Sequence, residues 1–440
     1  MRISPFSVIT GTAIAVFSFA VLADSPHGAS AIPSSLPTYR ITDFGVTPNS
    51  NADSYEGMKR AAEAVCKTGG TLIYPAGTYS ILEHRIDGGP DKNAVTDVLY
   101  QHCHNVVVSG YGAVIRVNGA LRRTADYLSG NHLPYSYHNA LVPFHIEDAD
   151  NITIEGFELS GGVDQMSRDP QVTEGLNHGI VTDNCRHFTL KDLDIHHFAA
   201  DGLYIGRNLR VADEDGLIEN VRSHHNARQG LSILQAHNIL VRDSIFSATG
   251  RTGSYGSHAP GAGVDVEPNA ITIPPTSDIY FEHCVFSDNM GGAFLSGHPD
   301  KTGNIFMNNS QFIGAPDAPA HTVFLNLAPG IFTNNTFTVP DKHGIPLTYA
   351  STTSAIRYEN NIFNLASPIG LYAEKNTGYN IAFIGNQINI TQTNAARSPL
   401  FLNNLGAVEN NIITFKGARP VIPTPVSFDG TQKASGNRIQ

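Results

Sequence analysis

Two acidic side chains, Asp265 and Glu267, stand two residues apart in the segment AGVDVE. On a β-strand both would point to one side, with Cα atoms about 6.6 Å apart. Enzymes that hydrolyse glycosidic bonds use two carboxyl groups about 5 to 5.5 Å or about 6.5 to 9.5 Å apart. Crowding two acids raises the pKa of one of them, which then keeps a proton to donate. The pair therefore predicts acid-base chemistry, against the plainer readings of solvated surface acids or a cation site.

The segment around this pair is one of four similar copies. Alternating apolar residues in each copy are typical of equivalent strands that stack with their apolar sides inward. The segments are HGIVTD from His178, DGLYIG from Asp201, QGLSIL from Gln229 and AGVDVE from Ala262. Aligned, they form a column of His178, Asp201, Gln229 and Ala262 at the strand entry, an outward column of Val181, Tyr204, Ser232 and Asp265, and a next outward column of Asp183, Gly206, Leu234 and Glu267.

These columns supply the remaining candidates. Asp201 is the alternative acid or base. Tyr204 is expected to stack on a sugar ring or to act as the base of a lyase, although an outward Tyr is often only packing. Arg207 and Arg228 flank the face and could bind a carboxylate. The full substrate-binding set that we predict is Tyr204, Arg207, Arg228, His178, Asp183, Gln229, Ser232 and His298.

Histidine pairs and a glycine-rich loop lie close to these segments. His196, His197, His224 and His225 fit turns better than a reactive site. The loop SATGRTGSYGSHAPG, Ser247 to Gly261, ends just before Asp265 and is expected to form a wall that helps to select the substrate, with Tyr255 and His258 at its tip.

The elements that carry these residues repeat along most of the chain. Segments rich in β-branched residues, each preceded by a small or polar residue, recur at intervals of 25 to 27 residues from Asp278 to Ala407. Intervals of this length indicate a solenoid, and the longer intervals before Asp278 indicate loops inserted into coils. A β-sandwich would repeat strands about every 8 to 12 residues, so it fits less well.

A second repeat falls at the turns. Asp243, His283, Asn309, Asn335 and Asn360 each follow the first apolar position of a coil by a constant offset. Stacked polar turn residues can bond to neighbouring backbone, and Asn tolerates left-handed conformations. We therefore predict a ladder of polar turns along the solenoid.

Composition suits an elongated secreted β protein. Of the 440 residues, 41% are hydrophobic and 15% charged, with 41 Gly and 25 Pro. The net charge of −11 argues against binding to nucleic acid or to anionic membranes. It also disfavours a polyanionic substrate unless a local basic patch or a cation intervenes.

The first 31 residues are expected to be a signal peptide. Arg2 precedes an apolar run, and small residues suggest cleavage after Ala23 or Ala31. The mature protein would then be secreted or periplasmic, with no membrane segment left; a retained anchor is the alternative. Export permits a disulfide, for which Cys66 and Cys103 are the plausible pair, whereas Cys185 and Cys284 are expected to be buried fillers. No cysteine spacing suggests a metal site.

The segment before the coils is predicted to be a helical cap. Ser54 and its neighbours offer an N-cap, Met58 to Val65 show helical spacing, and Gly69 stops the helix. The run TDFGVTPNSNADSYEGMKRAAEAVCKTGGTLIYPAGTYSI, Thr42 to Ile81, resembles the entry segment of the pectate-lyase-like superfamily, which includes polygalacturonase-like hydrolases, phage tailspikes and alginate epimerases. The resemblance implies an all-β, single-stranded, right-handed parallel β-helix acting on polysaccharide.

The catalytic signatures of that superfamily are mostly missing. Thr182-Asp183-Asn184 and Asp201-Gly202 match only fragments of the polygalacturonase pattern, and the DPHD motif of mannuronan epimerases is absent. The resemblance thus implies a fold and not an activity. Its members also differ in oligomeric state, which leaves monomer and homotrimer both open.

Our prediction from the sequence is an elongated solenoid that begins with a short capping helix and carries a polysaccharide-cleaving site on its outer wall. Residues 38–100 form the cap and first coil, and 101–440 form the β-helix. Asp265, Glu267 and Asp201 hydrolyse glycosidic bonds without a metal or other cofactor. A polyuronate lyase or epimerase is the alternative, with Tyr204 and an Arg, or with Ca²⁺ held by Asp183, Asp265 and Glu267. A non-catalytic glycan-binding surface protein is the second alternative.

Overall fold

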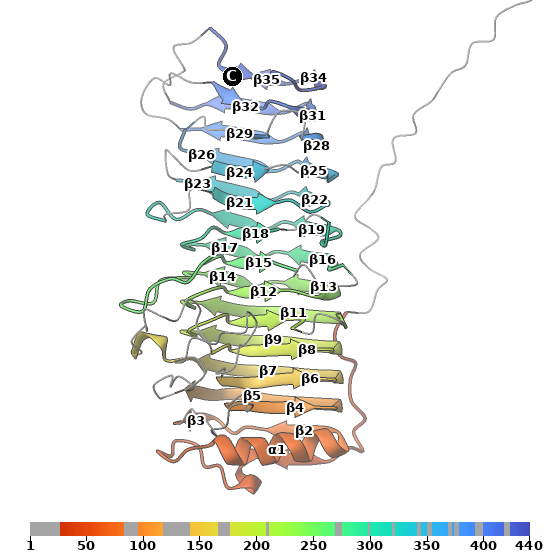
Figure 1. Cartoon of the computed structure of the whole chain (residues 1–440), viewed down its shortest axis with the longest axis vertical. Helices are drawn as coiled ribbons and strands as arrows, with labels where there is room; N and C mark the ends of the chain where they lie inside the picture. Colours follow the sequence, from red (N-terminus) through yellow and green to blue (C-terminus); the bar gives the residue numbers. More distant parts are fainter. Residues whose placement is uncertain are drawn as a thin grey trace, which may run out of the picture.

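The chain winds into stacked coils of parallel strands, as a computed structural model shows (Figure 1). The structure describes residues 27–82, 96–117, 141–165, 177–207, 211–268, 275–297, 300–318, 322–340, 345–349, 354–367, 372–373, 378–391, 399–417 and 423–440. Every strand pairing among these residues is parallel. The expected all-β solenoid is confirmed. His298 and most of the expected signal peptide lie outside the described residues.

One face of the solenoid is a ten-stranded sheet, to which the four aligned segments contribute neighbouring strands. Its strands are β4 (Thr96–Gln101), β6 (Leu141–Glu147), β8 (Ile180–Asp183), β10 (Leu203–Ile205), β12 (Leu231–Ile233), β15 (Val264–Val266), β18 (Phe294–Ser296), β21 (Thr322–Asn326), β24 (Ile345–Tyr349) and β27 (Tyr372–Ala373).

The other faces form one 23-stranded sheet that divides into two columns of shorter strands after β11. The first column holds β1 (Thr38–Arg40), β2 (Gly70–Ile73), β5 (His104–Val117), β7 (Asp150–Ser160), β9 (Arg186–His196), β11 (Asp213–His224), β13 (Ala236–Arg242), β16 (Ser277–Glu282), β19 (Ile305–Asn308), β22 (Gly330–Thr333), β25 (Ile356–Glu359), β28 (Gly378–Ile384), β31 (Leu405–Glu409) and β34 (Lys433–Ser435).

The second column joins the same long strands at their carboxyl ends. It holds β3 (Gly77–Ile81), β14 (Ile245–Ser247), β17 (Val285–Ser287), β20 (Gln311–Ile313), β23 (Thr336–Val339), β26 (Ile362–Leu365), β29 (Gln387–Ile390), β32 (Ile412–Phe415) and β35 (Arg438–Ile439). A separate pair, β30 (Leu400–Phe401) with β33 (Val426–Ser427), lies near the carboxyl end.

Identical side chains stack in the interior because successive coils hold the same register. Phe286, Phe312, Phe337 and Phe363 are buried neighbours with ring centroids 4.6 to 4.8 Å apart. Stacked aromatic pairs contribute about 0.5–1.5 kcal/mol each beyond the burial of their surface. The repeat therefore stabilises itself from one coil to the next.

Buried asparagines form a second internal stack at one turn. The side-chain oxygen of each accepts a hydrogen bond from a backbone N–H one coil earlier, as Asn361 does from Asn335 at 2.9 Å and Asn335 does from Ser310 at 2.8 Å. Its side-chain nitrogen donates to a backbone carbonyl, as Asn361 does to Phe332 at 2.9 Å. The buried members are Asn335, Asn361, Asn386 and Asn411, and the partly buried Asn437 continues the stack at the carboxyl end.

The predicted ladder of polar turns is present with one correction. The residues in the left-handed conformation include Asp243, His283, Asn309, Asn334 and Asn360, with φ between 51° and 57°. Asn334, and not the predicted Asn335, occupies this turn because Asn335 belongs to the buried stack one position later. The sequence pattern located the turn but missed the register of one Asn-Asn pair.

The amino-terminal end is covered by α1 (Tyr55–Thr68), with Ser54 at its N-cap position and Gly69 at its C-cap (Figure 1). The helix buries Met58, Ala61, Ala62 and Val65 on one side, as their spacing predicts. Cys66 and Cys103 form a disulfide, and Cys185 and Cys284 are buried free thiols. Two 3-10 helices, η2 (Ile41–Phe44) and η3 (Val163–Gln165), complete the described helices.

The segment before β1 lies against the long sheet. Gly28 N–H donates to the Asp215 carbonyl at 2.8 Å, and Ala29 N–H donates to Thr189 Oγ1 at 2.8 Å. Ser30 N–H donates to Asn151 Oδ1 at 2.6 Å. These contacts reach three successive long strands. In the described part of the chain, no helix has the length and apolar character needed to cross a bilayer.

Candidate active site

The strand register brings the predicted columns together on the outer side of the ten-stranded sheet. Tyr204 pairs with Val181 on one side and with Ser232 on the other, and Ser232 pairs with Asp265. The alignment of the four segments is therefore confirmed. Neighbouring strands of a sheet lie about 4.8 Å apart, so side chains in one column are in reach of each other.

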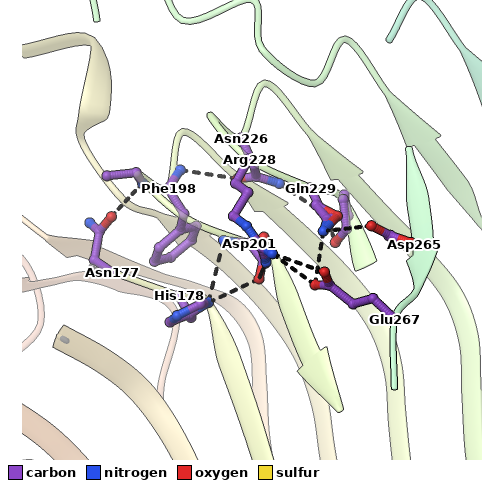
Figure 2. Close-up of polar contacts among 12 residues, drawn as sticks. Asn177, His178, Phe198, Asp201, Asn226, Arg228, Gln229, Asp265 and Glu267 are labelled. Carbon is purple, nitrogen blue, oxygen red and sulfur yellow. Dashed lines mark hydrogen bonds and ion pairs between the residues drawn. The ribbon is translucent and has the colours of Figure 1, made fainter. Parts of the chain in front are cut away.

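Arg228 and Gln229 bind the carboxyl groups into one cluster (Figure 2). Arg228 Nη1 donates to Asp201 Oδ2 at 3.0 Å, and Arg228 Nη2 donates to Glu267 Oε1 at 2.9 Å and Oε2 at 3.1 Å. Gln229 Nε2 donates to Asp265 Oδ2 at 3.2 Å and to Glu267 Oε1 at 3.0 Å. The five residues form what we call the acidic cluster.

The contacts of Gln229 limit the separation of Asp265 and Glu267. Because one nitrogen bonds to an oxygen of each carboxyl, those two oxygens can be no farther apart than about 6 Å, the sum of the two bond lengths. A separation of this size lets both groups contact one glycosidic bond.

Asp201 lies deepest in the acidic cluster. Its side chain has no exposed surface, whereas that of Glu267 is 26% exposed. The backbone N–H of Asp201 donates to His178 Nδ1 at 3.3 Å, and the same nitrogen lies 3.5 Å from Asp201 Oδ2 (Figure 2). Asp201 thus contacts Arg228 and His178 from the buried side of the acidic cluster. Glu267 is the carboxylate of the cluster that lies nearest to solvent.

The turn before Asp201 is held by two buried asparagines that the sequence analysis missed. Asn177 Oδ1 accepts from the backbone N–H of Ala199, and Asn226 Oδ1 accepts from that of Phe198 at 3.0 Å (Figure 2). Asn177 and Asn226 come from the coils on either side of this turn. Their position just before the strand entry was the available signal, but loop asparagines are too common for it to be distinctive.

Burial and crowding set the protonation of the acidic cluster. Burial, with the negative charges of Glu267 and Asp201 added to it, raises the pKa of Asp265 well above its ordinary value against the opposing effect of Arg228. Burial also raises the pKa of Glu267, while Arg228 and Gln229 oppose that rise. For Asp201, burial is outweighed by Arg228, His178 and Ser232, so its pKa is lowered. The cluster therefore favours a protonated Asp265 beside an ionised Asp201.

Tyr204 is packed rather than presented to solvent. It is buried with Val142, Val181 and Leu234, and its ring lies 4.9 Å from the His178 ring, centroid to centroid. Ser232 is also buried. Tyr204 and Ser232, which we predicted to contact the substrate, thus face outward but are covered by their neighbours.

A second polar group lies nearer to α1 and was also missed. His145 Nδ1 lies 2.6 Å from Asp97 Oδ2, and both side chains are buried. His145 pairs with Val181, and Glu147 pairs with Asp183, so these residues extend the two outward columns by one strand. Carrying the alignment back to the segment PFHIED would have found His145 and Glu147.

Asp183 and Arg207 belong to this second group and not to the acidic cluster. Burial raises the pKa of Asp183, while the charges of Arg207 and His145 oppose that rise. The nearby Asp213 is fully buried and accepts from Gly206 N–H at 2.8 Å and Cys185 N–H at 2.7 Å, and burial raises its pKa to about 7. Asp213 thus holds the ends of β8 and β10 in place.

The loop from Ser247 to Gly261 packs at the entry side of the strands. Tyr255 is buried with Val163, Ala199 and Ala227, and His258 is buried with its backbone N–H bonded to the Ala227 carbonyl at 2.7 Å. Tyr255 and His258, which we predicted at the tip of a wall that helps to select the substrate, are both buried. Their apolar and ring surfaces are used instead to fix the loop to the solenoid.

The histidine pairs lie where strands pass into turns: His196 and His224 end β9 and β11, and only His197 and His225 occupy the expected turns. His197 and His225 have left-handed backbone, and the rings of His196 and His224 stack 5.1 Å apart. Among the described residues, no three His, Cys, Asp or Glu side chains come together as a metal site. Asp183 lies apart from Asp265 and Glu267, which bond to Gln229 and Arg228.

Stacked parallel coils with an acidic cluster on one outer face define a parallel β-helix protein. The chain belongs to the right-handed β-helix family, whose profile, described as "Right handed beta helix region", matches residues 144–323 and 265–413. The resemblance to pectate-lyase-like proteins is thereby confirmed at the level of fold. A search of curated protein sequences finds no match.

Solved structures share the fold at low sequence identity. The A-module of mannuronan C-5 epimerase AlgE6 from Azotobacter vinelandii is 12% identical, with a TM-score of 0.57 over 91% of this chain and 99% of that one. PfbA, a surface adhesin of Streptococcus pneumoniae, is 12% identical, with a TM-score of 0.55 over 92% and 93%.

A third similar structure is the catalytic unit of a GH87 alpha-1,3-glucanase from Streptomyces thermodiastaticus. It is 15% identical, with a TM-score of 0.54 over 94% of this chain and 70% of that one. The three proteins are an epimerase, an adhesin and a glucanase. Because one fold hosts such different activities, function has to be argued from the site.

Proposed function

We propose that the protein hydrolyses glycosidic bonds in a polysaccharide at the acidic cluster. The observation that carries the proposal is that Asp265 and Glu267 both accept a hydrogen bond from Gln229 Nε2, while burial and the charge of Glu267 raise the pKa of Asp265 well above its ordinary value. Glycosidic hydrolysis needs one carboxylic acid and one carboxylate on either side of the bond. The cluster supplies both within reach of one bond.

Asp265 is the proton donor in this proposal. Burial and the neighbouring Glu267 raise its pKa, so the acid keeps its proton at a pH where an exposed aspartate would have lost it. Transfer of that proton to the glycosidic oxygen lets the bond break without expelling an alkoxide. General acid catalysis of this kind is worth about 10²–10⁴-fold in rate.

Glu267 is the carboxylate that acts on the sugar or on water. It is the most exposed acid of the cluster, and Arg228 and Gln229 donate three hydrogen bonds to its oxygens, which oppose the rise in its pKa that burial causes. Asp201 is fully buried under Arg228, so we assign it a positioning role. It holds the guanidinium group of Arg228 in the position from which Arg228 donates to Glu267.

The alternative of a lyase or epimerase receives less support. Both reactions require a positive group that neutralises the carboxylate of a uronate. Arg228 already bonds to Asp201 and Glu267, and the charge of Arg207 acts on Asp183. Three acids share the charge of one arginine in the acidic cluster, an arrangement that repels a further carboxylate.

The test follows the purified protein with a panel of neutral and uronate polysaccharides, recording reducing ends and ultraviolet absorbance together. New reducing ends without absorbance are the expected result. Reducing ends with the absorbance of an unsaturated uronate would replace the hydrolase with a lyase. If no polymer gave a product, epimerisation and glycan binding would remain as the alternatives. The apolar run before Ala23 supports placing this activity outside the cytoplasm.

A further inference from the structure

Asp97 and His145 form a buried pair in close contact and not an exposed pair on the surface. The two side chains are 4% and 8% exposed, and Asp97 Oδ2 lies 2.6 Å from His145 Nδ1. By register, His145 lies in the outward column that ends at Asp265, four strands away through β8, β10 and β12. The pair therefore belongs to the same face as the acidic cluster.

Polar atoms of this site are buried without a partner. His145 Nε2, Asp97 Oδ1 and Asp183 Oδ1 are inaccessible to water and make no hydrogen bond within the described ranges. Buried polar atoms are almost always hydrogen-bonded, so orphaned ones call for a missing ligand. Gln229 Oε1 in the acidic cluster is in the same condition. Both sites thus contain buried polar atoms without a hydrogen-bond partner.

The chemistry of these atoms indicates what the ligand offers. The bond to Asp97 Oδ2 uses His145 Nδ1 and leaves Nε2 as the ring nitrogen that a ligand can reach. Asp97 Oδ1 and Asp183 Oδ1 are acceptors as well, so the ligand must donate hydrogen bonds. Asp183 pairs with Glu147 on the neighbouring strand, and the charges of Glu147 and Asp148 act on it together with those of Arg207 and His145. With Asp97 beside His145, acids outnumber basic side chains among the described residues of the site. A carboxylated or sulfated sugar would be repelled.

We propose that Asp97, His145 and Asp183 form a second sugar-binding subsite, which takes a neutral, hydroxyl-rich stretch of the polysaccharide that is cleaved at the acidic cluster. The inference rests on the proposed hydrolysis and adds the class of substrate. Four strand steps at about 4.8 Å place the two sites about 19 Å apart. A polymer reaches both sites, whereas a short oligosaccharide bound at Asp265 reaches only one.

Binding is measured apart from catalysis, in the background of the inert variant Asp265→Asn, so that the polymer stays intact. The protein is run through gels containing dextran, galactomannan or xylan as neutral probes, and polygalacturonate or alginate as acidic ones. The double variant Asp97→Leu/His145→Phe removes both partners together and leaves no orphaned charge, which protects folding. Thermal unfolding measures whether the double variant is folded.

The matched control is His187→Asn. His187 also pairs with aspartates, Asp150 at 2.8 Å and Asp215 at 3.6 Å, but it lies on the long sheet, outside the ten-stranded face. If the Asp97–His145 pair were only structural, its removal should affect polymer binding no more than His187→Asn does. If the pair is a binding subsite, only its removal should weaken polymer binding.

We expect a neutral polymer to retard the background protein and the control, and the double variant to lose about tenfold in affinity, as the loss of about 1.4 kcal/mol of hydrogen bonding would produce. In the otherwise unchanged enzyme, the double variant should raise KM for the polymer with kcat retained and leave short oligosaccharides unaffected. Unchanged binding and KM in a folded double variant would overturn the subsite. Tighter binding of the acidic polymers would overturn the substrate class.

These outcomes are separable from failure of the proposed hydrolysis. Retardation that depends on His145, without any new reducing ends from the wild type, retains the subsite and rejects hydrolysis. New reducing ends with no effect of the double variant do the reverse. If none of the five polymers retards the protein, the subsite is rejected.

Discussion

At the scale of single residues, the proposal depends on Asp265 and Glu267. Asp265→Asn keeps the shape of the side chain and removes the proton donor, so we expect hydrolysis to fall by about 10²–10⁴-fold with the fold intact. Glu267→Gln should fall similarly. Initial rates of reducing-end release, with thermal unfolding as a check on folding, measure both effects.

A matched exchange separates catalysis from a general effect of losing a charge. Asp243→Asn makes the same substitution at an exposed left-handed turn where other coils carry Asn309 and Asn360. It should leave activity unchanged. If Asp265→Asn retained wild-type activity, Asp265 would not be the acid, whatever the control did.

The pH dependence tests the protonation argument. Because burial and Glu267 raise the pKa of Asp265, activity should decline only as pH rises through that raised value, above the ordinary range of an aspartate. Glu267→Gln removes one of the raising charges, so the pKa of Asp265 should fall. NMR titration of labelled aspartate carboxyl carbons in the two proteins measures the shift directly; an unchanged titration would contradict the coupling.

The same shift has a consequence for stability with a definite sign. A carboxyl whose folded pKa is raised stabilises the fold fully below its unfolded pKa and loses that contribution as pH rises through the folded value. Wild type should therefore lose Tm toward higher pH more steeply than Asp265→Asn does. Parallel Tm profiles for the two proteins would argue that Asp265 is not held in its neutral form.

The sequence predicted part of this site and missed part of it for physical reasons. Asp265, Glu267 and Asp201 could be placed together because strand register is set by an alternation that one sequence displays. Their partners Arg228 and Gln229 were expected, but as substrate ligands rather than as the groups that bind the acids. His145 was missed because its segment was left out of the alignment, and Asn177 because a side chain that supports a turn has no pattern of its own.

At the scale of elements, the buried asparagine stack should determine the strength of each coil. Asn361 accepts from Asn335 N–H and donates to the Phe332 carbonyl, so Asn361→Ala leaves a buried donor and a buried acceptor without partners. Each orphaned group costs about 1–3 kcal/mol, so we expect about 2–6 kcal/mol lost from the free energy of unfolding. Denaturant unfolding measures the loss.

The neighbouring residue provides the control for this prediction. Asn360 has φ at 57°, and Gly385 stands at the corresponding turn of the next coil with φ at 66°. Asn360→Gly should therefore change stability by only a few tenths of a kcal/mol. Equal losses for Asn360→Gly and Asn361→Ala would mean that the turn as a whole, and not the buried bonds, is the source of stability.

At the scale of the whole molecule, most of the architecture could be predicted from repetition. The period of 25 to 27 residues and the alignment of the strands could be predicted because each coil repeats the pattern of the one before, whereas the helical cap was predicted from its own spacing and capping residues. Burial of the outer columns could not be predicted from the sequence. It depends on contacts between side chains of neighbouring coils on the outer side of the sheet, such as the contact of Arg228 with Asp201. Loops resisted prediction for the same reason: Tyr255 is fixed by contacts with residues of three other segments.

The position of the amino-terminal segment leads to a prediction about the mature chain. Cleavage after Ala31 would remove Gly28, Ala29 and Ser30, which bond to three successive long strands. Cleavage after Ala23 keeps all three bonds, so we expect the exported protein to begin at Asp24. Sequencing the amino terminus of the secreted protein decides between the two sites, and a chain starting at Ile32 would contradict the prediction.

A truncation measures what this segment contributes. A chain starting at residue 32 loses three hydrogen bonds, each worth about 1 kcal/mol net, and should unfold with about 2–4 kcal/mol less free energy than a chain starting at residue 24. Thr189→Val in the longer chain removes only the acceptor of the Ala29 N–H and should cost about a third as much. If the truncated chain were as stable as the longer one, the segment would add nothing to the solenoid, and cleavage after Ala31 would be equally compatible with the fold.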